Sequence, residues 1–171
     1  MYNEKNTKKF IDLKSKLSGY NLDEDDYNDN EISSYEANIK SIIAAYFDDS
    51  KDNFPEEFIL SHNPVADTTE EKRNSVYLFG NGKVYQFYIT EDDFIGGLDV
   101  FDLHNIKDTE YMFRFDKTKT LDNTQGIYAE KPDIDYIRMV FENNKILVLR
   151  KNAHNKKRFN DIKEYIFKYL K

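Results

Sequence analysis

Apolar residues in the first third of the chain recur at helical spacing in two segments. Phe10, Leu13 and Leu17 fall on one side of a helix that Gly19 can end. A second helix is predicted over residues 34–47, where the apolar stripe contains Tyr35, Ile39, Ile42, Ile43 and Tyr46. The first third of the chain is therefore expected to be largely helical.

Local signals suggest where these helices begin and what separates them. Ser33 and Glu36 have the spacing of a capping box at the start of the second helix. Pro55 can occupy the first turn of a short third helix that continues to Ile59. Residues 21–31 carry six acidic residues and no basic one, and charge repulsion favours a loop there.

After Arg73 the helical pattern gives way to short apolar runs separated by turns. Residues 76–79 and 84–88 flank an Asn81-Gly82 pair. Asn and Gly best tolerate the two positive φ angles of a type I′ turn, so these two runs predict a β-hairpin.

A second predicted hairpin closes the strand-rich region. Residues 137–141 and 146–150 have strand-like patterns and flank Asn143-Asn144. Three further strands, rich in aromatic or β-branched residues, are predicted between the hairpins, at 100–106, 111–115 and 127–130. The strand-rich region therefore holds seven predicted strands.

The chain closes with an amphipathic helix, whose apolar side is expected to cover an open end or face of the sheets. The apolar residues at helical spacing are Phe159, Ile162, Ile166 and Tyr169 or Leu170. The predicted fold class is α+β. An N-terminal helical segment, residues 1–73, precedes a seven-stranded antiparallel β sandwich or barrel capped by a C-terminal helix, residues 74–171.

This order of elements is similar to the pleckstrin-homology-like (PH-like) architecture. Residues 100–108, VFDLHNIKD, look like the third strand of bacterial members, and residues 136–170 run from a final hairpin straight into a helix. The resemblance covers residues 76–171. It implies a fold rather than an activity, because this architecture hosts many activities and scaffolding roles.

Domains of this type that bind inositol phosphates usually carry several Lys and Arg residues in the first hairpin. Here Lys83 is followed by residues 84–90 without another positive charge. Phosphoinositide binding is therefore disfavoured.

Composition indicates a folded, intracellular protein. Hydrophobic residues make up 39% of the 171, and 13 Tyr with 13 Phe supply large apolar surfaces that a disordered chain lacks. The absence of cysteine excludes disulfides and thiolate sites, and the polar start lacks the apolar core of a secretory signal. No apolar stretch approaches the roughly 20 residues that cross a bilayer. We therefore expect a cytoplasmic protein without a transmembrane segment.

The net charge of −7 is distributed unevenly. Residues 145–171 carry nine Lys or Arg and two acidic residues, a local charge of +7, so residues 1–144 carry −14. An acidic body repels nucleic acid and anionic lipid at long range. Nucleic acid is therefore disfavoured as a partner, and another protein is favoured.

A basic cluster, Lys151, Lys156, Lys157 and Arg158, stands at the start of the last helix, where the helix dipole disfavours positive charge. A phosphate-bearing ligand, nucleic acid, an acidic partner or the chain's own acidic residues 23–29 would each suit it. We favour an intramolecular or solvated role.

Residues 25–36 can be laid on a twelve-residue calcium loop, in which Asp25, Asp29, Ser33 and Glu36 supply side-chain oxygens or hydrogen bonds. Position 3 of this loop is tyrosine, and position 6 is asparagine where glycine is needed. The capping box explains Ser33 and Glu36 without any metal, so no metal residue is assigned.

The three histidines, His62, His104 and His154, are 42 and 50 residues apart, so a metal or catalytic site would have to be assembled by tertiary approach. We interpret all three as ordinary surface or hydrogen-bonded residues. No catalytic or cofactor-binding residue is assigned.

The favoured function is a non-enzymatic protein-interaction or binding domain, because surface tyrosines suit protein contacts. Two alternatives stay open. One is a small hydrolase or transferase that uses a histidine and a carboxylate in a cleft, and the other is an acidic inhibitor or immunity-type protein that binds a basic partner. An enzyme should place His104 or His62 beside a buried acid in the largest pocket, whereas an interaction protein should expose an aromatic or acidic patch.

Overall fold

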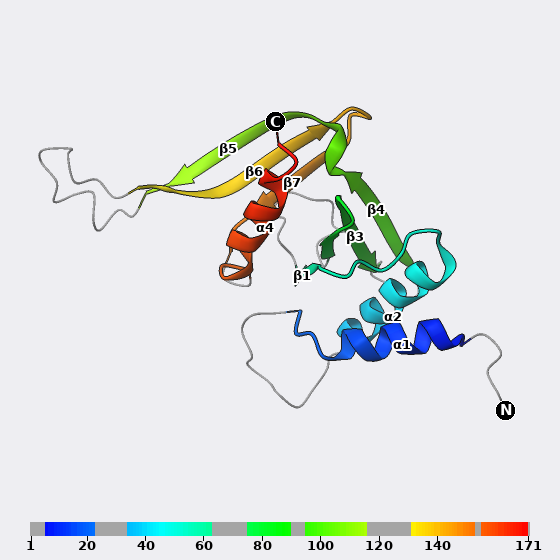
Figure 1. Ribbon diagram of the computed structural model, residues 1–171. Coiled ribbons are helices and arrows are strands. Elements are labelled where there is room, and N and C mark those ends of the chain that lie inside the picture. Colours follow the sequence, from blue (N-terminus) through cyan, green and yellow to red (C-terminus); the bar gives the residue numbers. More distant parts are fainter. Residues whose placement is uncertain are drawn as a thin grey trace, which may run out of the picture.

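The computed structural model describes residues 6–22, 34–62, 75–89, 95–115, 131–152 and 155–170. This part of the chain forms three α-helices and two antiparallel sheets of four and three strands, which do not close into one barrel (Figure 1). The fold class is therefore α+β, as the sequence predicts.

The structure contains two N-terminal helices, which confirms the prediction made from the spacing of the apolar residues. They are α1, Lys8–Ser18, and α2, Ser34–Asp49. The Thr7 hydroxyl accepts a hydrogen bond from the backbone N–H of Phe10 at 3.1 Å and donates one to Asp48 at 2.8 Å. Thr7 thus caps α1 and ties its start to the end of α2.

The four-stranded sheet is an antiparallel meander in the order β1-β2-β3-β4. Its strands are β1, Ile59–His62, β2, Val76–Gly80, β3, Lys83–Ile89, and β4, Gly96–Asp102. The β2–β3 turn confirms the first predicted hairpin, since Asn81 and Gly82 have φ angles of 57° and 69°.

The second sheet is also an antiparallel meander, in the order β5-β6-β7. Its strands are β5, Ile106–Arg114, β6, Asp133–Phe141, and β7, Ile146–Arg150. The β6–β7 connection confirms the second predicted hairpin, with Asn144 at a φ of 66°.

The predicted third helix after Pro55 is wrong, because this segment leads into strand β1. Ile59 lies opposite Phe79 of β2, and His62 lies opposite Val76. Ile59 packs into one core cluster and Leu60 into another, which is the two-residue alternation of a strand. Pairing with β2 and burial on both faces outweigh the local helix-start signal.

The strand predicted over residues 100–106 is interrupted. β4 ends at Asp102, a 3₁₀ helix, η2, covers Leu103–Asn105, and β5 begins at Ile106. The Asp102 carboxylate accepts a hydrogen bond from the backbone N–H of His104 at 3.0 Å, which favours a turn over continued pairing. The chain changes sheets at this point.

The described part of the chain contains seven strands, but they are not the seven predicted. The predicted strand at 111–115 falls within β5 apart from its last residue, and the one at 127–130 lies outside the described residues. The seventh described strand is instead β1, which the sequence did not predict.

The four-stranded sheet is covered on both faces. One core cluster lies between this sheet and α1 and α2, and includes Ile43, Phe47 and Phe87. The other lies between the two sheets and α4. Burial on both sides explains why β2, with all five residues buried, does not alternate apolar and polar residues. Residues before and after position 73 thus share one sheet and one core cluster.

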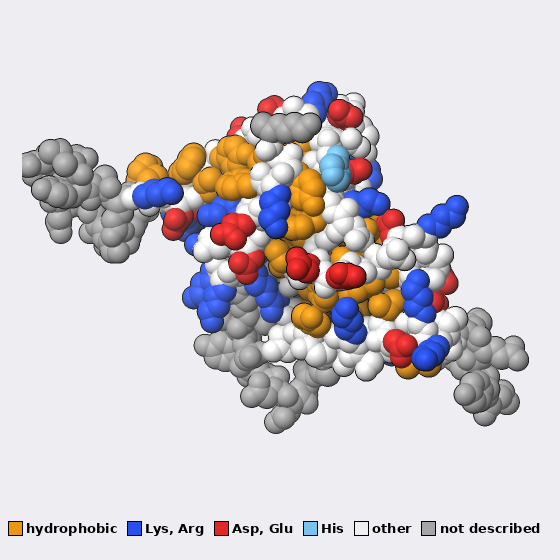
Figure 2. Space-filling model, in the orientation of Figure 1, with side chains coloured by type: hydrophobic (Ala, Val, Ile, Leu, Met, Phe, Trp, Pro, Cys, Tyr) orange, Lys and Arg blue, Asp and Glu red, His pale blue; other side chains and the backbone are white. Residues whose placement is uncertain are grey.

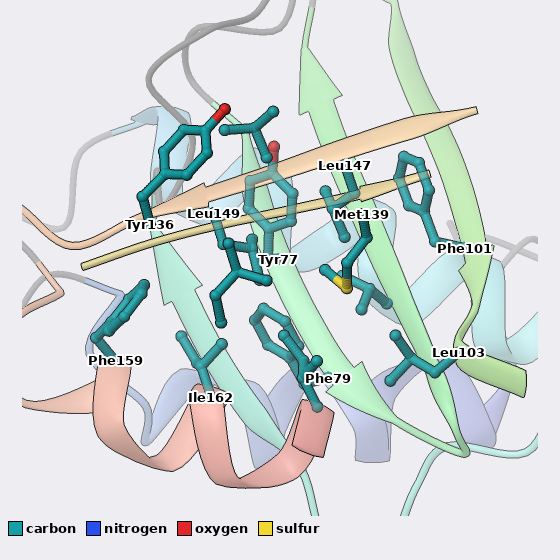
Figure 3. Packing of buried hydrophobic residues seen from close by; sticks show 14 of the residues in the cluster. Tyr77, Phe79, Phe101, Leu103, Tyr136, Met139, Leu147, Leu149, Phe159 and Ile162 are labelled. Carbon is teal, nitrogen blue, oxygen red and sulfur yellow. The ribbon is translucent and has the colours of Figure 1, made fainter. Parts of the chain in front are cut away.

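The last helix, α4, Arg158–Phe167, confirms the predicted amphipathic cap. Its buried residues are Phe159, Ile162 and Ile166. In Figure 3, Phe159 and Ile162 point from α4 toward Leu149 and neighbouring residues of the core between the sheets. The helix is therefore an integral part of that core.

Candidate functional site

The most prominent feature of the surface is an apolar region on the β5–β6 ribbon, which projects from the body of the protein (Figure 1). Met112, Phe113 and Phe115 are 50%, 55% and 57% exposed, and Phe167 of α4 is 39% exposed. These are four of the eight large hydrophobic side chains that are exposed among the described residues. Scattered exposed apolar residues are normal, whereas a cluster of large exposed apolar residues is a candidate interaction site.

Three aromatic residues follow one another closely along the ribbon. Tyr111 and Phe113 are two residues apart in β5, so strand alternation places them on the same side, and Phe115 comes directly after the last residue of the strand. Tyr111 packs against the core between the sheets, and its ring centroid lies 6.0 Å from that of Phe167 in an edge-to-face arrangement. Phe113 and Phe115, which follow Tyr111 along the chain, are both more than half exposed. We call Tyr111, Phe113, Phe115 and Phe167 the aromatic strip.

Figure 2 shows orange side chains extending from the body of the protein along the projecting ribbon. Charged side chains are spread over the same view, including the ribbon itself. Apolar side chains are therefore exposed along the described part of the ribbon as well as on the body of the protein.

β5 is also an edge strand. It pairs with β6 along one side, and no strand of the described residues pairs with its other side. A nine-residue edge leaves backbone N–H and C=O groups that can accept a further strand. Tyr111 and Phe113 of the aromatic strip lie on this edge strand, Phe115 follows it directly, and Phe167 of α4 packs against Tyr111.

β5 also carries four charged residues among its apolar ones. They are Lys107, Asp108, Glu110 and Arg114. The Arg114 Nε atom lies 2.7 Å from the Asp135 carboxylate of β6, although the Arg114 side chain is largely exposed. The edge therefore combines apolar area with charges of both signs.

The best candidate for an enzyme site is His104 beside Asp102, with Nδ1 and Oδ1 2.9 Å apart. Asp102 also lines a cavity of about 330 Å³ together with Phe101, Asn105, Phe141, Glu142 and Asn143. His104 does not line this cavity, and its side chain is 65% exposed. The pair therefore lacks the buried acid and the histidine in a pocket that the enzyme hypothesis requires.

The pKa of the Asp102 carboxyl has a structural explanation. Partial burial raises it, but the hydrogen bonds from the backbone and ring of His104 outweigh burial and hold the pKa below its usual value. The same bond to the backbone stabilises the 3₁₀ turn. The turn therefore explains why Asp102 and His104 are paired, and this explanation requires no catalytic role.

A second polar group surrounds Asp52. Its carboxylate accepts hydrogen bonds from the hydroxyls of Tyr46 and Tyr85, at 3.0 and 3.1 Å, and pairs with Lys83 at 3.3 Å. Burial, together with the Asp52 charge, raises the pKa of Tyr85 to about 12. Burial alone would raise the pKa of Asp52, but its three donors lower it. The group ties the end of α2 to β3 and offers no reactive base.

We expect Asp52→Asn to destabilise the protein by about 1 kcal/mol at neutral pH, because the ion pair and charge-assisted hydrogen bonds weaken. Since folding lowers the pKa of Asp52, its contribution is present above the unfolded-state pKa and is lost as the pH falls through the folded value. Urea unfolding between about pH 7 and about pH 3 checks this. Exposed Asp49→Asn is the control, and an equal loss in both variants would contradict the prediction.

The other predicted site residues do not converge. His62 lies on β1 with its ring centroid 5.8 Å from that of Tyr35, and His154 lies outside the described residues. Asp25, Asp29 and Ser33 also lie outside them, and Glu36 pairs with Lys40 at 2.9 Å within α2. No group of three or more potential His, Asp or Glu metal ligands occurs within the described ranges. Calcium binding by residues 25–36, which the sequence does not favour, stays untested because most of these residues lie outside the described ranges.

The basic cluster divides into two parts. The Arg158 guanidinium donates to the backbone carbonyls of Leu22, at 3.1 Å, and Leu60, at 2.8 Å, and also to that of Asn21. Lys156 and Lys157 are exposed. Arg158 therefore has intramolecular partners, but these are backbone carbonyls, and the acidic residues 23–29 lie outside the described ranges.

Sequence reasoning missed the aromatic strip, although a signal is present. Residues 111–115, YMFRF, place apolar side chains at three consecutive positions, which an exposed strand of alternating pattern does not do. The pattern identifies a strand, but it does not show that this strand is the edge of a sheet.

None of the helices within the described ranges is long and apolar enough to span a membrane. No protein-family model matches the chain, and no curated protein or solved structure matches it either. A functional assignment must therefore come from the geometry of the chain itself.

Proposed function

We propose that this chain is a non-enzymatic protein-interaction domain of PH-like architecture that binds its partner through the aromatic strip and the free side of β5. The observation that carries the proposal is the coincidence of exposed aromatic residues with an unpaired strand edge on one projecting element. Apolar area supplies affinity, and the edge supplies directional hydrogen bonds.

The order of elements supports the PH-like part of the proposal. A four-stranded meander is followed by a three-stranded meander and then by one helix packed on the core between them. This order is similar to that of PH-like domains, which serve widely as platforms for binding.

The arrangement of titratable groups supports a role without catalysis. His104 and Asp102 form an exposed pair that serves a turn, and Asp52 serves as a structural acceptor. Catalytic groups usually lie in a concave site where burial tunes their pKa for proton transfer at neutral pH. The acidic-inhibitor alternative would use the negative charge of the chain, whereas the exposed aromatic residues favour an apolar contact.

We expect the double variant Phe113→Ser/Phe115→Ser to lose its partner while it keeps its fold. Both side chains are more than half exposed, so the free energy of unfolding should change by less than about 0.5 kcal/mol for each. A photo-crosslinking benzoylphenylalanine at position 110, next to Tyr111 on β5, reports the contact in extracts of cells that make the protein. The specific adduct should disappear when the two serines are introduced.

Ile11→Ser on α1 is the matched control, because Ile11 is 52% exposed but lies outside the aromatic strip. It should leave the adduct unchanged. Adduct formation that survives in the double variant, or that disappears equally in the control, would refute the role of the strip.

A further inference from the structure

The free side of β5 has a regular stretch long enough for a second strand. Two register shifts occur between β5 and β6, one at Lys107 of β5 and one where Asp135 is the extra residue of β6. Residues 108–114 are therefore consecutive and unbulged on β5 itself. Seven such residues exceed the usual length of an exposed edge that is blunted against association.

The charges of β5 are complementary to themselves under two-fold symmetry. In a symmetric antiparallel pair, each residue faces the one equally far on the other side of the axis. With the axis at Tyr111, Arg114 of each copy faces Asp108 of the other. With the axis at Met112, Arg114 faces Glu110 instead. Neither alignment places like charges opposite one another within the strand.

Charge repulsion disfavours a neighbouring alignment of the two β5 strands. With the axis at Glu110, the two Glu110 carboxylates would face each other, which destabilises a strand pair. The sequence of charges thus favours the two alignments that join acid to base. An unrelated partner strand would not require this internal complementarity.

The aromatic strip fits the same arrangement. With the axis at Tyr111, the two Tyr111 rings lie opposite each other and Phe113 faces Thr109. With the axis at Met112, Tyr111 faces Phe113. Aromatic cross-strand pairs of this kind stabilise antiparallel sheets. The strips of both copies would then form one continuous apolar band across a six-stranded sheet.

We propose that the occupant of the β5 edge is a second copy of this chain, held by antiparallel β5–β5 pairing about a two-fold axis. This inference rests on the proposed interaction function and names its partner. Each Arg114 then shares its charge between Asp135 of its own chain and an acidic residue of the other copy. The contact is isologous, so it closes as a dimer and does not propagate.

Analytical ultracentrifugation of the purified full chain tests the proposal. With rising concentration, the mass should increase from 20.4 kDa toward twice that value. Arg114→Glu should remain monomeric at concentrations where the unmodified chain dimerises, because the introduced glutamate faces acids. Asp108→Arg/Glu110→Arg should also remain monomeric, because the introduced arginines face Arg114.

An equimolar mixture of these two variants is the decisive sample. The glutamate introduced at position 114 of one variant then faces an arginine introduced at position 108 or 110 of the other. The unmodified Arg114 of the second variant faces Asp108 or Glu110 of the first, so the dimer mass should return. Lys9→Glu on α1 is the control and should dimerise like the unmodified chain. A mixture that stays monomeric, or variants that dimerise alone, would overturn the pairing.

Hydrogen–deuterium exchange of the unmodified chain provides a measurement that does not depend on variants. Among residues 108–114, the amides that point away from β6 should exchange more slowly as the concentration rises. Protection confined to another element would overturn the β5 contact.

The outcomes also separate this inference from the proposed function. A chain that is monomeric at every concentration but crosslinks from position 110 to a different protein would overturn the dimer and leave the interaction domain in place. A monomeric chain without any strip-dependent adduct would overturn both.

Discussion

Phe159→Ala should lower the free energy of unfolding by about 3–5 kcal/mol, which is the usual cost of removing a buried phenylalanine. Phe159 is fully buried in the first turn of α4, within the core between the sheets (Figure 3). Its removal leaves a cavity at the junction of α4 with both sheets. Equilibrium urea unfolding monitored by circular dichroism measures the loss.

The matched control is Phe167→Ala on the same helix. Phe167 is 39% exposed, and its principal aromatic contact is Tyr111, so its loss should cost clearly less than that of Phe159. If the two variants were equally stable, α4 would not be packed on the sheets as the structure has it. The comparison therefore tests the helix cap separately from the aromatic strip.

The elements with strong local patterns could be predicted from the sequence. Phe159, Ile162 and Ile166 have one helical period, and Asn81-Gly82 has one favoured turn geometry. In both cases the tertiary fold agrees with the local preference. Prediction succeeds there because neighbours in sequence determine the conformation.

β1 could not be predicted in this way, since four residues are too few to display a reliable period. Its conformation depends on pairing with β2, which begins fourteen residues after β1 ends, and on cores that lie on both faces of the sheet. Pro55 gave the stronger local signal and led to the wrong helix. Non-local pairing decided the outcome.

Only part of the candidate site could be predicted from the sequence. The apolar run YMFRF was visible, but its exposure depends on β5 being an edge strand and on α4 ending near Tyr111. The His104–Asp102 pair, in contrast, is a contact two residues apart in sequence. Proximity in sequence made that pair easy to find, but its exposure argues against catalysis.

Substitution of Arg158 should also lower the stability of the protein strongly, because this residue joins three separate parts of the chain. Its guanidinium donates to carbonyls of Asn21 and Leu22, which follow α1, and to that of Leu60 in β1. We expect Arg158→Met to destabilise the protein by about 2–3 kcal/mol, because methionine keeps much of the apolar stem and removes the charged donors. Urea unfolding measures the change.

Lys156→Met is the control for charge and size, because Lys156 is exposed and lies two residues before Arg158. It should change the free energy of unfolding by less than about 0.5 kcal/mol.

Hydrogen exchange adds a local test. The His62 amide donates to the Leu22 carbonyl at 3.1 Å, beside the bond from Arg158. Arg158→Met should therefore accelerate exchange at His62 more than at Phe87 in the centre of the sheet. Equal stability of the two methionine variants would mean that Arg158 does not hold these segments together, and the basic cluster would again be available for an external ligand.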